Sequence, residues 1–325
     1  MDMKQPRPSD VLDAELRLHK IVVNTPILQS TRINTLVGGT VSVKLESLQH
    51  TGAFKFRGAY NCLSQLDSKR YPDGVLAYST GNHGQAIATV GNRLGLRTTV
   101  VMPSDAPAVK RERAREQGAN IILYDRKTES REDIAKRLAS AGTFAVIPPG
   151  DHPDVIAGQG TVALESLRAL GQESVDLVMA PCGGGGLSAG TCLALDALRS
   201  KAEVWAVEPE RFDDTRRSLV SGVREVNADS QVSICDALLA KTPALLPFSI
   251  NQNRLSGVLT ADDVHVLRAM RLLYEEFRVV VEPGGAVAMA SLLANPVFLK
   301  GRHAVVIASG GNVDINIFLQ AIDDR

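Results

Sequence analysis

Short apolar runs alternate with amphipathic stretches along most of the chain. Apolar runs of about five residues between turn residues are typical of buried strands, and apolar positions spaced three and four apart are typical of helices. The pattern predicts strands at residues 40–45, 75–78, 98–102, 120–124, 143–147, 175–180, 204–207 and 304–308. It predicts helices at residues 11–20, 85–94, 108–117, 129–141, 161–170, 187–198, 260–277 and 286–293. Strands that alternate with helices indicate βαβ units and parallel sheets.

Two segments give a less regular pattern. In the first predicted helix, Leu12, Leu16 and Leu18 are expected on the buried side. Residues 211–256 show no clear period, and the proline-containing stretch 241–247 is expected to be an irregular loop. We therefore assign no regular element between residues 211 and 256.

A turn signal divides the alternating pattern. The Pro-Pro-Gly run at residues 148–150 follows a predicted strand and favours a break in regular structure. We expect a small mobile domain at residues 71–151, inserted into a large domain made of residues 1–70 and 152–325. The predicted fold class is α/β, with two doubly wound parallel-sheet domains.

Composition narrows the class of function. The 325 residues carry 36 Lys and Arg against 36 Asp and Glu, so no global field attracts nucleic acid or an anionic membrane. No apolar run reaches the ~18 residues of a membrane span, and no signal peptide is recognisable at the N-terminus. The 4 cysteines show no CxxC spacing, which favours reduced thiols. We expect a cytoplasmic protein whose partner is a small molecule.

One lysine lies in an unusually apolar stretch. Lys55 stands between Phe54 and Phe56, and Gly52 and Gly58 bracket the three residues. Apolar surroundings disfavour the ammonium form of a lysine, because the charge loses its hydration. The neutral amine is the nucleophile that Schiff-base chemistry needs. A solvated lysine at the start of a helix fits the same spacing.

Four consecutive glycines lie between a predicted strand and a predicted helix. They are Gly183, Gly184, Gly185 and Gly186, and Leu187 follows them. Glycines let the backbone turn tightly and direct several N–H groups at one anion, to which the helix N-terminus adds partial positive charge. We therefore expect a bound phosphate. No Gly-Lys-Ser/Thr follows, so this is not a nucleotide P-loop; a plain strand-to-helix turn is the alternative.

Polar residues follow two other predicted strands. Ser79, Thr80, Asn82 and His83 precede a helix, and Ser309 follows the last strand. Ligands of open parallel sheets bind at the carboxyl ends of the strands. Hydroxyl and amide groups there suit a carboxylate and a phenolic oxygen. Helix capping and a structural histidine explain the first group as well.

An acidic stretch follows the strand at residues 204–207. It includes Glu208 and Asp214, whose carboxylates suit a hard cation such as Mg²⁺ or Ca²⁺. A solvated acidic loop fits the same spacing.

A reactive lysine, a phosphate cradle and a polar loop for a carboxylate are together what a pyridoxal-phosphate enzyme acting on an amino acid requires. The chain resembles the fold-type II pyridoxal-phosphate enzymes (tryptophan synthase β-like), in their serine/threonine dehydratase and serine racemase branch. The resemblance is carried, in chain order, by residues 51–59, 79–84, 183–186 and 309–312, and also by residues 129–137.

This resemblance implies roles for individual residues, and it places the cofactor in the large domain. Lys55 would form the Schiff base and transfer the proton. The other cofactor contacts implied are Phe54 against the ring, Asn82 at the phenolic oxygen, Gly183 to Gly186 and Leu187 at the phosphate, and Ser309 at the pyridine nitrogen. The substrate contacts implied are Ser79, Thr80, Asn82, His83 and Arg131. Glu208, Asp214 and the backbone of Phe212 would form a divalent-cation site. The resemblance also implies a homodimer.

The hydroxyl of Ser309 indicates the reaction type. Unlike a carboxylate, a hydroxyl does not hold the pyridine nitrogen protonated, so the ring is a weaker electron sink. That suits β-elimination, in which the leaving group departs as the Cα proton is removed. We expect an ammonia-lyase that converts a 3-hydroxy amino acid (threonine, serine or a bulkier one such as 3-phenylserine) into a 2-oxo acid and ammonia. Residues 235–237 differ from those of threonine dehydratases, which weakens the case for threonine itself.

Thr80 separates this reaction from racemisation. Many relatives carry serine at this catalytic position, where the hydroxyl is the base on the opposite cofactor face in racemases. Threonine keeps the hydroxyl but adds a stiff, β-branched methyl, so we rank amino-acid racemase second. A β-replacement enzyme and a non-catalytic pyridoxal-phosphate-binding protein are further alternatives.

Overall fold

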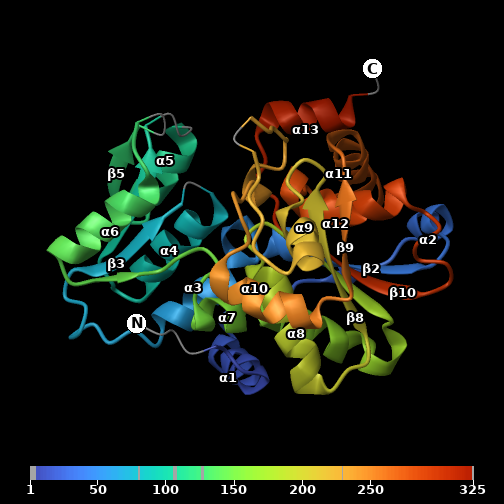
Figure 1. Ribbon diagram of the computed structural model, residues 1–325, viewed down its shortest axis with the longest axis horizontal. Coiled ribbons are helices and arrows are strands. Elements are labelled where there is room, and N and C mark those ends of the chain that lie inside the picture. The colour runs from blue at the N-terminus through green and yellow to red at the C-terminus, as the bar shows by residue number, and fades with distance from the viewer. Residues whose placement is uncertain (1–4, 80, 105–107, 126–127, 229, 324–325) are drawn as a thin grey trace.

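The protein consists of two lobes, each built on its own mainly parallel sheet (Figure 1). The computed structural model describes residues 5–79, 81–104, 108–125, 128–228 and 230–323. The larger sheet has the order β1-β2-β10-β7-β8-β9, and the smaller has the order β5-β4-β3-β6. Within the larger sheet only the β1–β2 pair is antiparallel. The predicted α/β class with two parallel sheets is confirmed.

The strands of the larger sheet are β1 (Ile27–Leu28), β2 (Thr40–Leu45), β7 (Leu177–Pro181), β8 (Glu203–Pro209), β9 (Gly257–Ala261) and β10 (His303–Ala308). Those of the smaller sheet are β3 (Gly74–Tyr78), β4 (Thr98–Pro103), β5 (Asn120–Tyr124) and β6 (Phe144–Val146). The helices before residue 150 are α1 (Pro8–Leu18), α2 (Thr31–Val37), α3 (Lys55–Leu63), α4 (Asn82–Arg93), α5 (Ala108–Glu116) and α6 (Arg131–Ala141). The later helices are α7 (Pro153–Leu170), α8 (Gly186–Leu198), α9 (Asp214–Ser221), α10 (Leu245–Arg254), α11 (Asp263–Phe277), α12 (Pro283–Ala294) and α13 (Ile315–Ile322).

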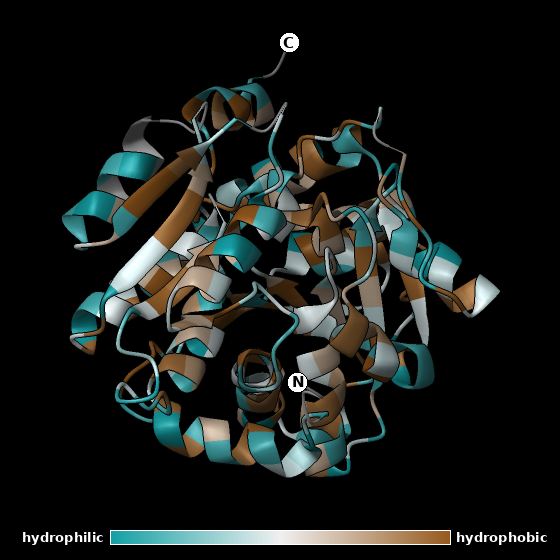
Figure 2. Ribbon diagram, turned by 60° about the vertical axis from the view of Figure 1, so that its left-hand side comes forward, coloured by the Kyte–Doolittle hydropathy of each residue, from teal (hydrophilic) through white to brown (hydrophobic). Residues whose placement is uncertain are grey.

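The larger sheet is buried on both faces by different helices. In β7, Leu177 and Met179 belong to the apolar core shared with α11 and α12. Val178 and Ala180, which point the other way, belong to the core shared with α1, α7 and α8. Because successive side chains of a strand alternate between faces, a strand buried on both sides is apolar throughout. The brown strands enclosed by half-teal helices in Figure 2 show this layering.

The smaller sheet follows the same rule. Val75 and Ala77 of β3 pack into a core with α3 and α4, while Leu76 packs on the opposite face with α6. Figure 1 shows this lobe in green and teal; its strands are β3 to β6, and α4, α5 and α6 lie between them in the sequence. The domain boundaries at residues 70/71 and 151/152 stay a prediction.

Several predicted elements differ from those observed. Leu16 was predicted to be buried but is exposed. The buried face of α1 is formed by Val11, Ala14 and Leu18, which are spaced three and four residues apart, and a residue two positions from Ala14 and Leu18 lies on another face. The predicted loop at residues 241–247 was wrong in its last part, since α10 begins at Leu245. Its proline occupies the first turn, where a missing N–H breaks no helical hydrogen bond.

The helix predicted at residues 260–277 begins only at Asp263, because Thr260 and Ala261 belong to β9. The helix α9 lies in the segment to which no regular element was assigned. No prediction was made for β1, α2 or α13.

Among the residues that the structure describes, no helix is both long enough and apolar enough to cross a membrane.

Candidate active site

The polar turns at the carboxyl ends of β3, β7 and β10 surround one cavity. Its volume is about 440 Å³. The predicted site residues that line it are Phe54, Lys55, Ser79, Asn82, His83, Arg131, Gly183, Gly184, Gly185, Gly186, Leu187 and Ser309. Thr80 lies outside the described residues. The topology thus brings together segments that are far apart in the sequence, as expected at this edge of a parallel sheet.

Lys55 is the first residue of α3 and projects into the cavity. Its Nζ donates a hydrogen bond to the carbonyl oxygen of Pro149 at 2.6 Å and lies 5.0 Å from the centre of the Phe54 ring. Burial lowers the pKa of Lys55 to about 8, although the nearby charge of Glu282 acts in the opposite direction. A substantial fraction of the amine is therefore neutral near pH 8, as nucleophilic attack requires.

The start of α3 is fixed by the strand that ends at Ser309. The backbone N–H of Phe54 donates to the carbonyl oxygen of Ser309 at 3.0 Å, and Ala53 forms an isolated bridge with Gly310. These contacts place Lys55 beside Ser309, which is 4% exposed and lines the cavity.

A buried ionic network holds α3 from behind. The guanidinium of Arg57 donates to both carboxylate oxygens of Glu46, at 2.8 and 2.7 Å, and to Glu165 at 2.9 Å. Lys44 also bonds Glu165 and donates to the carbonyl oxygen of Thr25 at 2.7 Å. Arg57 and Glu46 are 1% and 0% exposed. Buried charges persist only when paired, so this network fixes the helix that carries Lys55.

The glycine loop is shaped to hold an anion. β7 ends at Pro181 and α8 begins at Gly186, directly after Gly185, whose φ is +90°. A Cβ on Gly185 would lie 2.7 Å from Asn251 Nδ2, and one on Gly186 would lie 3.0 Å from the Cα of Gly150. The first N–H groups of α8 have no partner within the helix. A phosphate at this loop therefore meets free donors and the positive end of the helix dipole.

Asn82 belongs to a hydrogen-bond chain at the cavity wall. Its Nδ2 donates to Glu282 Oε1 at 2.6 Å, and its Oδ1 accepts from Asn312 Nδ2 at 2.8 Å. Glu282 is only 3% exposed, lines the cavity and raises the pKa of Lys55 through its charge. Sequence reasoning missed Glu282. The signal that marks it is an acidic residue directly before the Pro-Gly-Gly that starts α12.

His83 is buried and uncharged. Its Nε2 lies 2.9 Å from the carbonyl oxygen of Ile147, so this nitrogen carries the proton. Burial, with a smaller contribution from Lys55, lowers the pKa of His83 to about 3. Its Nδ1 is buried and has no hydrogen-bond partner among the described residues. The bare nitrogen is an acceptor that a protonated ligand group can satisfy.

The acidic stretch after β8 forms a buried pair of carboxylates outside the cavity. Glu208 accepts from the backbone N–H groups of Thr215 and Arg216, at 2.9 and 3.0 Å, and Asp214 accepts from Asn227 at 2.6 Å. Burial and the charge of Asp214 raise the pKa of Glu208 to about 8, and burial raises that of Asp214 to about 6. Asp214 Oδ2 is buried and has no partner within the described chain. A bound cation would satisfy this oxygen and both charges, so these groups fit the predicted divalent-cation site.

The chain matches known proteins over almost its whole length. Residues 18–310 match the family model described as "Pyridoxal-phosphate dependent enzyme". The L-threo-3-hydroxyaspartate ammonia-lyase of Saccharomyces cerevisiae is 41% identical, over 98% of this chain and 97% of the relative. The serine racemase of Schizosaccharomyces pombe is 37% identical, over 95% of each chain. The crystal structure of the serine racemase from Dictyostelium discoideum superposes with a TM-score of 0.88 at 36% identity, covering 95% of this chain and 99% of that one.

These matches agree with the geometry of the cavity. Its lysine, its glycine loop at a helix N-terminus and its buried polar groups fit pyridoxal phosphate, which needs an amine and an anion site. The chain belongs to the family of pyridoxal-phosphate-dependent enzymes.

Proposed function

We propose that the protein is an ammonia-lyase that dehydrates 3-hydroxy amino acids, with L-threo-3-hydroxyaspartate as its preferred substrate. The observation that carries the proposal is a buried Lys55, its pKa lowered to about 8, in a cavity that also presents Ser309, a hydroxyl rather than a carboxylate. The yeast relative, named for this activity, supports the choice of substrate.

The chain's own residues supply the acid–base steps. Bound pyridoxal phosphate supplies an electron sink for the charge that develops at Cα. Lys55 would hold the cofactor covalently, and its free amine would remove the Cα proton of the bound substrate. Gly183 to Gly186 would hold the phosphate, and Asn82 would donate to the phenolic oxygen. Ser309 would face the pyridine nitrogen with a hydroxyl, which would not hold that nitrogen protonated and so would favour departure of the Cβ hydroxyl.

Cations at the cavity account for a substrate with two carboxylates. Ser79 and His83 line the cavity, and we assign the α-carboxylate of the substrate to them. Arg131 and Lys241 also line the cavity. 3-Hydroxyaspartate carries one more carboxylate than serine or threonine, and a cationic side chain within reach of it favours its binding.

A substrate screen with one matched pair of variants tests this proposal. We expect 2-oxo acid and ammonia from L-threo-3-hydroxyaspartate at a higher kcat/KM than from serine, threonine or 3-phenylserine. Arg131→Met and Lys241→Met are expected to raise the KM for 3-hydroxyaspartate more than the KM for serine. Faster turnover of threonine or 3-phenylserine would contradict the substrate assignment. Turnover that persists in Lys55→Ala would contradict the mechanism.

Racemisation is the second candidate function, supported by the relative in Schizosaccharomyces pombe. Its test is incubation of L-serine in deuterated water followed by chiral analysis of the recovered amino acid. A deuterated D-product formed faster than the oxo acid would reverse the order. Added sulfide tests β-replacement in the same assay. Absence of any turnover would favour a non-catalytic pyridoxal-phosphate-binding protein.

We also propose that Glu208, Asp214 and the carbonyl of Phe212 bind Mg²⁺ or another divalent cation, and that the protein is a homodimer. The unpartnered Asp214 oxygen supports the first point. Analytical ultracentrifugation of the holoenzyme tests the second, and a monomer at working concentration would contradict it.

A further inference from the structure

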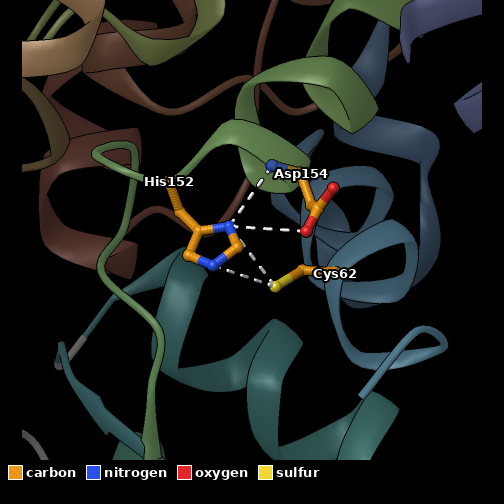
Figure 3. Close-up of side chains that lie close together, drawn as sticks. All are labelled: Cys62, His152 and Asp154. Carbon is orange, nitrogen blue, oxygen red and sulfur yellow. Dashed lines mark hydrogen bonds and ion pairs between the residues drawn. The ribbon is translucent and has the colours of Figure 1, made fainter. Parts of the chain in front are cut away.

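Three side chains with metal-binding atoms face one another where the end of α3 meets the start of α7. Cys62 lies in the last turn of α3, His152 directly precedes α7, and Asp154 lies in its first turn (Figure 3). Cys62 Sγ lies 3.7 Å from His152 Nδ1, and this nitrogen lies 3.9 Å from Asp154 Oδ2. The ligand atoms of this Cys62–His152–Asp154 cluster all lie within 4.8 Å of one another. The proposed reaction uses none of them.

The spacing of these atoms is close to that of a zinc centre. With bonds of about 2.3 Å to sulfur and about 2.1 Å to nitrogen and oxygen, tetrahedral zinc places sulfur and nitrogen about 3.6 Å apart and nitrogen and oxygen about 3.4 Å apart. The observed 3.7 and 3.9 Å are slightly wider. Metal binding therefore requires the Asp154 carboxylate to move closer to the other two ligand atoms.

The exposure of the three side chains gives the cluster a buried and an open side. Cys62 is 4% exposed, whereas the side chains of His152 and Asp154 are 21% and 41% exposed. A metal therefore has a route from solvent past the carboxylate, and water can fill a fourth coordination position. Thiolate, imidazole and carboxylate together favour Zn²⁺ over the oxygen-seeking cations Mg²⁺ and Ca²⁺.

Helix capping explains only part of this arrangement. His152 Nδ1 accepts the backbone N–H of Asp154 at 3.2 Å, so the imidazole caps α7. Asn, Ser or Thr serves that purpose as well or better. Capping accounts neither for the thiol nor for the carboxylate that converge on the same nitrogen.

We propose that the Cys62–His152–Asp154 cluster binds Zn²⁺ through Sγ, Nδ1 and Oδ2, with water as the fourth ligand. The metal replaces the thiol proton, which passes to the buffer, and the N–H of Asp154 gives up its bond to Nδ1. The site joins the C-terminal end of α3 to the segment that leads into α7. At the other end of α3, Lys55 contacts the same segment by donating a hydrogen bond to the carbonyl of Pro149. Bound Zn²⁺ therefore stabilises the junction on which Lys55 depends.

Cobalt substitution tests the proposal in the holoenzyme. Co²⁺ is added in excess Mg²⁺, and its ligand-field bands are read at wavelengths beyond those that the cofactor absorbs. We expect a tetrahedral cobalt–thiolate spectrum in the wild type that Zn²⁺ abolishes and that Cys62→Ala lacks. Cys182→Ala is the matched control, because Cys182 is the buried thiol beside the proposed Mg²⁺ site. Its Sγ lies 3.4 Å from Thr215 Oγ1, near the Glu208 and Asp214 carboxylates. This control is expected to keep the spectrum.

A second variant separates loss of the ligand from loss of the fold. Asn at residue 152 can still cap α7 but offers no imidazole. His152→Asn is expected to lower the Zn²⁺ affinity, measured by calorimetry, by more than about 100-fold. Loss of a residue that only hydrogen-bonds to a metal ligand typically costs at most about 100-fold, so a larger loss identifies His152 as a ligand. The thermal midpoint of this variant without metal should stay close to that of the wild type. No cobalt–thiolate spectrum in the wild type, the same spectrum in Cys62→Ala, or wild-type Zn²⁺ affinity in His152→Asn would each overturn the proposal.

Discussion

The amine of Lys55 is tuned by two opposing influences. Burial lowers its pKa to about 8, and the carboxylate of Glu282 limits the decrease. Only the neutral amine attacks the cofactor aldehyde. The rate at which apoenzyme recombines with pyridoxal phosphate should therefore rise with pH and level off above about pH 8. Stopped-flow absorbance across the pH range measures this rate, and a rise that continues beyond about pH 10 would indicate an unperturbed lysine.

Glu282→Gln is the variant that separates the two influences. It removes the charge that raises the pKa of Lys55, so the plateau should begin at lower pH. A plateau shifted to higher pH would contradict this role of Glu282. The amide can still pair with Asn82, so the fold should tolerate the change.

The buried pair of Arg57 and Glu46 gives a prediction about stability. Glu46→Gln leaves the guanidinium with one charged partner, Glu165, and removal of one partner of a buried ion pair costs about 3–5 kcal/mol. The free energy of unfolding in urea measures the loss. Asp196→Asn, which breaks a partly exposed pair with Arg254, is the control and should cost under about 1 kcal/mol. Equal losses for the two variants would show that the buried network does not hold α3.

The carboxylates of Glu208 and Asp214 predict a pH-dependent response to Mg²⁺. Each carboxyl has a higher pKa in the folded state than its ordinary value. The folded protein therefore becomes less stable as pH rises from the ordinary pKa to the folded-state pKa, which is about 8 for Glu208. A cation binds the ionised pair and offsets this loss. Mg²⁺ should therefore raise the thermal midpoint more at about pH 8 than at about pH 6. Glu208→Gln should abolish the difference; an equal effect of Mg²⁺ in that variant would place the cation elsewhere.

At the residue scale, Lys55 could be predicted because its phenylalanine neighbours and the glycine loop are visible in the sequence. Glu282 could not, because its importance depends on contact with Asn82, which lies 200 residues away. The Cys62–His152–Asp154 cluster was missed for the same reason, since its cysteine and histidine are separated by 90 positions.

At the level of elements, the loop between β7 and α8 predicts different outcomes for adjacent glycines. Gly185 has a φ of +90°, and a Cβ there would lie 2.7 Å from Asn251 Nδ2. A Cβ on Gly184 would lie 3.7 Å from that of Ala244, which is an ordinary contact. Gly185→Ala should therefore destabilise the apoenzyme by about 1–2 kcal/mol or more from backbone strain. Gly184→Ala should leave apoenzyme stability unchanged.

Cofactor affinity completes this comparison. Both variants should bind pyridoxal phosphate more weakly, because each adds a methyl group to the loop that meets the phosphate. Fluorescence titration of apoenzyme measures the affinity, and urea unfolding measures the stability. Wild-type affinity in both variants would show that the phosphate does not lie at this loop.

The elements that sequence reasoning missed have a common physical cause. β9 forms the edge of the larger sheet, and its burial is only partial, so it lacks the continuous apolar run of a central strand. The helix α10 contains a proline and several polar residues, and it is ordered by packing on α8. The local pattern of apolar residues predicts an element that buries a regular apolar face. It does not predict β9 or α10, because these two elements are ordered by contacts with other parts of the fold.

At the scale of the whole molecule, the two lobes contribute unequally to cofactor binding. Ser309 and the glycine loop follow strands of the six-stranded sheet, whereas Asn82 and His83 begin α4 in the four-stranded lobe. Lys55 begins α3, whose apolar side chains pack into the core of that smaller lobe with β3 and α4. The alternating pattern predicted both sheets. It could not predict the strand order, which depends on pairings such as β10 with β2, far apart in the sequence.

This unequal division predicts where removal of pyridoxal phosphate acts. A ligand present at about 100 times its Kd stabilises the folded state that binds it by about 2.7 kcal/mol. This stabilisation should be largest in the segments that contact the cofactor. In hydrogen exchange followed by mass spectrometry, apoenzyme should exchange faster than holoenzyme at the N-terminal turns of α3 and α8. Peptides from α5 and β5, which contribute no described residue to the cavity, are the internal control and should be unchanged. Equal acceleration in α5 and β5 would mean that the cofactor holds the two lobes together as one cooperative unit.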